Sequence, residues 1–129
     1  MRSLAVVLAA VALLASACGK PSPKVYSSAK SRACFRAQHV RIGPPPASDF
    51  VASTALGGSF RVHLNRNFVT VSFGDTVDNA SSLDHEYRTV HARNVGIDDV
   101  LRTQGNAVML WHAHPSDGDL ALVQGCLKT

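Results

Sequence analysis

The chain has 129 residues and a formal net charge of +4, and its charges are unevenly distributed. Seven of the 13 basic residues precede the first acidic residue, Asp49, whereas residues 42–129 carry six basic and nine acidic residues. The body of the chain is therefore mildly acidic and lacks basic residues interleaved with aromatic ones, so nucleic acid is not expected as a partner. The length fits one domain with a single core.

The first 18 residues have the layout of a secretory signal peptide. Arg2 supplies a positive start, residues 4–14 are an uninterrupted apolar run, and residues 15–17 form a small-residue cleavage site directly before Cys18. The apolar run has eleven residues, whereas a helix that crosses a bilayer needs about 20. We therefore expect residues 1–17 to be removed and the remainder to be exported.

Residues 14–18, with the sequence Leu-Ala-Ser-Ala-Cys, resemble the lipobox of bacterial lipoproteins. The resemblance implies cleavage before Cys18, acylation of its thiol and amino group, and attachment to a membrane through these lipids. In this chain Leu14 lies one position further from the cysteine than the usual large aliphatic residue. The same residues also fit ordinary Ala-x-Ala cleavage, which would give a secreted soluble protein. The resemblance covers residues 1–18 only, and the rest matches no family pattern.

The number of cysteines agrees with lipidation. If Cys18 carries lipid, Cys34 and Cys126 remain, and an exported protein can oxidise them to a disulfide. The sequence therefore predicts a Cys34–Cys126 bridge, with two buried free thiols as the alternative.

Hydrophobic periodicity and turn residues predict the elements in chain order. Residues 18–27 are basic and rich in Ser and Pro, and we interpret them as a flexible tether to a domain of residues 28–129. The expected elements are a helix over 28–37, a strand over 39–42, a helix over 49–56, a hairpin with strands 60–64 and 69–73, a helix over 77–91, a helical turn over 98–103, a strand over 107–111 and a helix over 117–128.

These elements predict an α+β fold with a small antiparallel sheet. Each strand of the hairpin has one apolar and one polar face, so we expect the helices to pack on one face of the sheet. The middle of the chain reads β-α-β-β-α-β, which allows a ferredoxin-like (split βαβ) arrangement with extra terminal helices. A looser sandwich with three sheet strands is the alternative.

Two histidines form the motif that most suggests chemistry. On a strand, His112 and His114 would point to the same side, so both imidazoles could hold one Zn or Cu ion, with His63 of the hairpin as a third ligand. The alternative is a pair of histidines at the exposed end of a strand. Two ligands without a third do not make a metal site.

The sequence has neither a glycine-rich phosphate loop nor a Gly-x-Ser-x-Gly nucleophile motif, and no enzyme is indicated. The leading hypothesis is an exported, lipid-anchored protein of the bacterial cell envelope. It would act without a cofactor as a binding or envelope-structural module, with an unidentified protein or small molecule as partner. The alternative is an extracytoplasmic Zn- or Cu-binding protein that uses His112 and His114.

Overall fold

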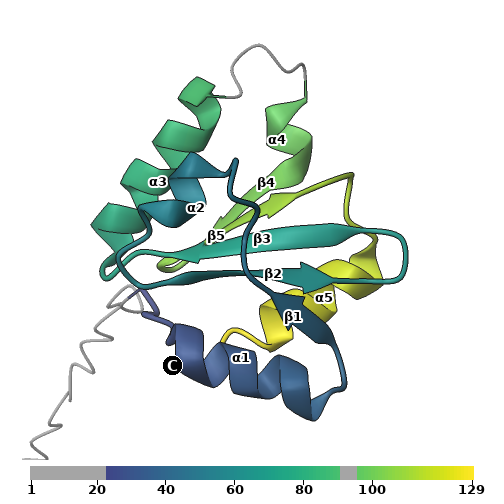
Figure 1. Cartoon of the computed structure of the whole chain (residues 1–129). Helices are drawn as coiled ribbons and strands as arrows, with labels where there is room; N and C mark the ends of the chain where they lie inside the picture. The colour runs from purple at the N-terminus through teal and green to yellow at the C-terminus, as the bar shows by residue number, and fades with distance from the viewer. Residues whose placement is uncertain (1–22, 91–95) are drawn as a thin grey trace, which may run out of the picture.

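The computed structural model describes residues 23–90 and 96–129 as a five-stranded antiparallel sheet with helices on both faces (Figure 1). This is an α+β fold with a small antiparallel sheet, as predicted. The helices are α1 (Ser28–Ala37), α2 (Phe50–Ser53), α3 (Val77–Val90), α4 (Ile97–Val100) and α5 (Asp117–Gly125). The strands are β1 (Arg41–Gly43), β2 (Ser59–His63), β3 (Phe68–Phe73), β4 (Leu101–Gln104) and β5 (Ala107–Trp111).

The strands lie in the order β1-β2-β3-β5-β4, and every neighbouring pair is antiparallel. Strands β3 and β4 therefore run parallel with β5 between them, which makes one split βαβ unit. A ferredoxin-like sheet needs a second such unit. Here β1 and β2, the strands on either side of α2, pair directly with each other. The ferredoxin-like arrangement and the three-strand alternative are both wrong.

Both faces of the sheet are covered, which corrects the prediction that the helices pack on one face. Phe60, Val71 and Met109 of the central strands pack in one cluster with residues of α1 and α5. On the opposite face, Val108 of β5 belongs to a second cluster with Val51 of α2 and residues of α3. Figure 1 shows α1 and α5 below the sheet and α2, α3 and α4 above it.

Most elements form where the periodicity places them, but β4 does not. Three residues of the predicted stripe on α3 are buried, namely Ala80, Leu83 and Tyr87. Residues 101–103, predicted as part of a helical turn over 98–103, instead belong to the edge strand β4 (Leu101–Gln104). Leu101 is buried there and lies opposite Leu110 of β5. Tertiary pairing with β5 therefore decides the conformation of this short segment.

The two terminal helices are joined by the predicted disulfide. Cys34 of α1 and Cys126, which caps the end of α5, are bonded with their Cα atoms 5.4 Å apart. The backbone N–H of Ser27 also donates to the carbonyl of Lys128 at 2.6 Å. Both ends of the domain are thus held together on the same face of the sheet.

A buried asparagine fixes the segment that precedes α1. The side chain of Asn106, 1% exposed, accepts from the backbone N–H of Tyr26 at 2.5 Å and donates to the carbonyls of Tyr26 and Gly74. Tyr26 itself is 8% exposed and belongs to the core. At Gly105, where φ is +54°, an added Cβ would lie 2.1 Å from the carbonyl oxygen of Lys24. Tyr26 and Ser27 therefore belong to the domain and not to the predicted tether.

Candidate ligand-binding cleft

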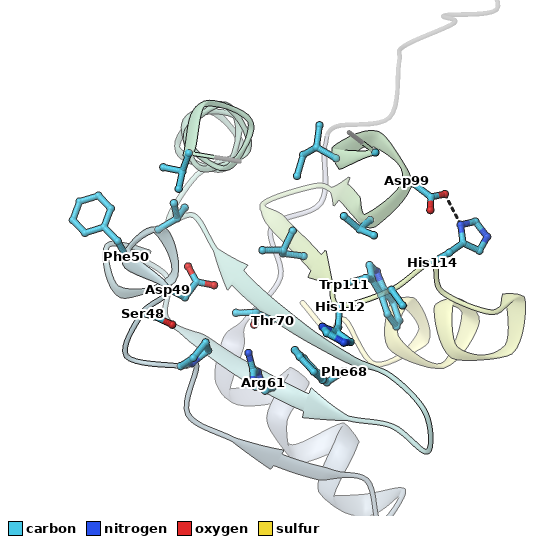
Figure 2. Close-up of a pocket in the computed structure, with 18 residues that line it drawn as sticks. Ser48, Asp49, Phe50, Arg61, Phe68, Thr70, Asp99, Trp111, His112 and His114 are labelled. Atoms are coloured by element: carbon cyan, nitrogen blue, oxygen red, sulfur yellow. Dashed lines mark hydrogen bonds and ion pairs between the residues drawn. The ribbon is translucent and has the colours of Figure 1, made fainter. Parts of the chain in front are cut away.

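A cleft of about 650 Å³ lies on the face of the sheet that carries α2, α3 and α4 (Figure 2). We call it the α2–α4 cleft, after the two short helices that stand on either side of it. Its walls are mostly apolar and include Phe50, Val51, Val90, Ile97 and Val100, and Leu110 lies on the sheet at its floor. Its floor carries Arg61, Phe68, Thr70 and His112. The volume lies within the range of about 300–1,000 Å³ that is common for small-molecule sites.

The alternation of the strands determines the residues of the floor. Arg61 of β2 pairs with Thr70 of β3, which in turn pairs with Leu110 of β5. These three side chains therefore share one face of the sheet. Beyond the end of β5, the backbone N–H of His112 donates to the carbonyl of Phe68 at 3.0 Å. Phe68 and His112 thus lie next to each other at the end of the same face.

Three floor side chains contact one another face to face. The guanidinium carbon of Arg61 lies 4.0 Å from the centroid of the Phe68 ring, within the range of a cation–π interaction. The Phe68 and His112 rings are stacked, with centroids 4.4 Å apart and planes 19° apart. Figure 2 shows Phe68 between Arg61 and His112. We call these three residues the Arg61 stack.

The side chain of Arg61 is half-buried, but it lacks the hydrogen-bond acceptor and the carboxylate that a half-buried guanidinium usually contacts. Its Nε atom is shielded from solvent and makes no hydrogen bond within residues 23–90 and 96–129. Across the same residues, its guanidinium forms no salt bridge with a carboxylate. Because guanidinium N–H groups are donors only, a buried one without an acceptor is costly. The cleft therefore contains a cation whose donors are not all satisfied.

Asp49, one of the two acidic residues that line the cleft, is engaged within the protein. Its carboxylate accepts from the backbone N–H of Ala52 at 2.9 Å and so caps α2. It also accepts from the hydroxyl of Tyr87, at 3.0 Å and 3.1 Å to its two oxygens. Tyr87 is fully buried, and this burial raises the pKa of its phenol well above the usual value. The phenol therefore remains a donor, and Asp49 is held in place on α2.

The three predicted metal ligands do not form a metal site. His112 stacks on Phe68, whereas Nδ1 of His114 lies 2.5 Å from a carboxylate oxygen of Asp99 on α4. His63 lies on β2, where its pKa is lowered by burial and by the charges of Arg41 and Arg61. No group of three or more His, Cys, Asp or Glu side chains comes together in the described part of the chain. The geometry thus corrects the proposed trio of His63, His112 and His114.

Cys18 and the predicted signal peptide lie outside the described residues. Within those residues, no helix is long and apolar enough to cross a membrane.

Sequence reasoning missed the residues that build the cleft. The alternation in residues 60–64 places Arg61 on the polar face of the hairpin, for which the sequence predicts exposure to solvent. The sequence places Asp49 and Phe50 in a predicted helix over 49–56, and it does not indicate that either residue lines a site. A usable signal was present, because residues 107–111 are apolar throughout, a pattern typical of a strand buried on both faces. The second face of the sheet therefore needed a covering layer, and Arg61 lies beneath it.

Comparison with known proteins gives no relative: no protein-family model matches the chain, and neither do curated proteins or solved structures.

Proposed function

We propose that the protein is an exported, lipid-anchored binding module of the bacterial envelope, with the α2–α4 cleft as its ligand site. The observation that carries the proposal is the cleft itself. It combines apolar walls with a few polar groups on a rigid sheet, which is the usual construction of a small-molecule site. Binding is favoured over catalysis because two titratable side chains of the cleft, Asp49 and His114, are already engaged by protein partners.

The exposure of apolar side chains at the cleft supports binding. Phe50 of α2 is 66% exposed and Val90 at the end of α3 is 61% exposed, and both line the cleft. When a ligand covers large apolar side chains around a concave site, their removal from water stabilises the complex. Burying one such side chain contributes about 1.5–3 kcal/mol.

Attachment through Cys18 is supported by the lipobox-like residues 14–18 and by the disulfide. Because Cys34 and Cys126 are bonded to each other, Cys18 is the one cysteine of the chain that does not take part in that bond. Labelling with a palmitate analogue in a bacterial host tests the anchor. The wild type should be labelled and should sediment with membranes, whereas Cys18→Ser should do neither. An unlabelled, fully soluble wild type would refute the anchor.

Binding in the cleft is tested with an uncharged apolar fluorophore such as Nile red. The dye should bind the wild type, and Phe50→Ser should weaken binding by about tenfold, the effect expected from losing one buried aromatic contact. Leu56→Ser is the matched control, because Leu56 is 69% exposed but does not line the cleft. Equal loss in both variants, or no saturable binding at all, would contradict the proposed site.

A further inference from the structure

We propose that the α2–α4 cleft binds an apolar monocarboxylate, with Arg61 as the group that receives the carboxylate. This inference rests on the proposed binding function and specifies the chemical class of the ligand. It starts from Arg61, which has a shielded Nε without an acceptor among the described residues. A carboxylate that enters the cleft would pair with the part of the guanidinium that lines it, whose charge no carboxylate of the described residues compensates. Guanidinium and carboxylate groups match each other in a planar, two-bonded geometry.

Arg61 is held in position before any ligand arrives. Its backbone lies in the middle of β2, paired with Gly43 of β1 on one side and Thr70 of β3 on the other. Its guanidinium is stacked on Phe68, which is in turn stacked on His112. Binding therefore does not have to immobilise a long, flexible side chain, a cost that otherwise reduces affinity. A lysine at this position could not make the same planar stack.

The charges of the cleft favour one negative charge on the ligand. Arg61 has no carboxylate within ion-pair distance in the described structure, so it offers one uncompensated positive charge. Two carboxylates line the same cleft: Asp49, which is held by Tyr87 and by the first turn of α2, and Asp99, which contacts His114. A dianion such as a phosphate monoester would gain the same Arg61 contact but would meet more repulsion from Asp49.

The remainder of the ligand is expected to be apolar. Figure 2 shows Phe50 on the α2 side of the cleft, away from Arg61 and Phe68 on the sheet. Ile97 and Val100 line the α4 side, and Leu110 lies on the sheet between the two helices. A ligand whose carboxylate is at Arg61 would therefore extend its other end between apolar walls. The proposed class comprises aryl- or alkyl-substituted monocarboxylic acids.

The test compares 4-phenylbutyrate with 4-phenylbutanamide, which has nearly the same shape but no charge. Binding is followed by calorimetry. The carboxylate should bind about tenfold more tightly than the amide, in keeping with a charge-assisted hydrogen bond. Arg61→Gln should remove this difference. Arg66→Gln, a change at an exposed arginine of the β2–β3 turn, should preserve it.

Folding of the Arg61→Gln variant is verified by urea denaturation, a measurement that does not depend on occupancy of the cleft. A second variant, Arg61→Lys, keeps the charge and should still bind the carboxylate less tightly than the wild type. Equal affinity of carboxylate and amide in the wild type would overturn the inference, and so would tighter binding of phenylalkyl phosphonate dianions. In either case, retained Nile red binding would leave the proposed binding function standing. Loss of all binding, including that of Nile red, would refute the proposed function itself.

Discussion

Breaking the Cys34–Cys126 disulfide is expected to remove a large part of the stability of the domain. The bond links residues that are 92 positions apart in sequence. In the chain-entropy model, a loop of this length lowers the entropy of the unfolded chain by about 16 cal/mol/K, which corresponds to about 4.6 kcal/mol at about 25 °C. The free energy of unfolding of a typical domain is about 5–15 kcal/mol, so the reduced protein should be only marginally stable.

Urea denaturation of the oxidised and reduced protein, in a Cys18→Ser background that prevents mispairing, measures this effect. Reduction should lower the free energy of unfolding by roughly 3–5 kcal/mol and raise the denaturant slope, because the unfolded chain becomes more expanded. Cys34→Ala should match the reduced protein, since Cys34 is only half-buried. Adding Cys126→Ala should cost about 1 kcal/mol more, because the fully buried Cys126 leaves a small cavity. A loss below about 1 kcal/mol on reduction would refute this reasoning.

Three further predictions concern buried or shielded polar groups. Tyr87→Phe removes the hydroxyl that bonds Asp49 and Ser72, and should cost about 2 kcal/mol in urea denaturation; a neutral change would contradict the role given to this contact. Asn106→Ala should cost about 3 kcal/mol and accelerate amide exchange at Tyr26, so unchanged exchange would disprove that Asn106 fixes this segment. The pKa of His63 is lowered below its ordinary 6.5 in the folded state, so the unfolded state binds more protons and stability should fall as pH decreases below 6.5. His63→Gln should reduce that pH dependence, and an identical slope in both proteins would count against it.

The sequence predicted best those elements whose periodicity and local signals agree. Residues 107–111 are apolar throughout and form the predicted strand, β5, which is covered on both faces. Residues 77–91 carry an apolar stripe at helical spacing, and α3 covers nearly the same range. The number of cysteines predicted the disulfide. If Cys18 carries lipid, only Cys34 and Cys126 remain to pair, and the structure bonds these two.

The pattern of the two hairpin strands alone does not reveal that the second face of the sheet is covered. Thr70 and Ser72 are polar, but they are 2% and 0% exposed beneath the helices of that face. Ser72 bonds to Tyr87, so its burial is stabilised by a partner that is distant in sequence. A pattern that assigns polar strand residues to solvent therefore misses the helical layer above them. Without that layer, Arg61 has no cleft to line.

The histidine prediction assumed that β5 continues past Trp111. The strand ends at Trp111, so the alternation that would align His112 with His114 does not extend to these residues. Each histidine contacts a different element: the His112 ring stacks on Phe68 of β3, and the His114 ring contacts the carboxylate of Asp99 on α4. Such partners lie far away in the chain, and spacing within a short motif carries no information about them.

The position of Asn106 has a consequence for how the protein would face its surroundings. Asn106 holds Tyr26 beside Gly74, at the end of the sheet where β3 finishes and β5 begins. Phe68 and His112, at the floor of the cleft, lie at the other end of these two strands. If Cys18 is in the membrane, as proposed, the fixed Tyr26 is the point from which the domain extends. The Arg61 stack would then lie at the end of the sheet opposite to the attachment point, where a ligand can reach it from the aqueous phase.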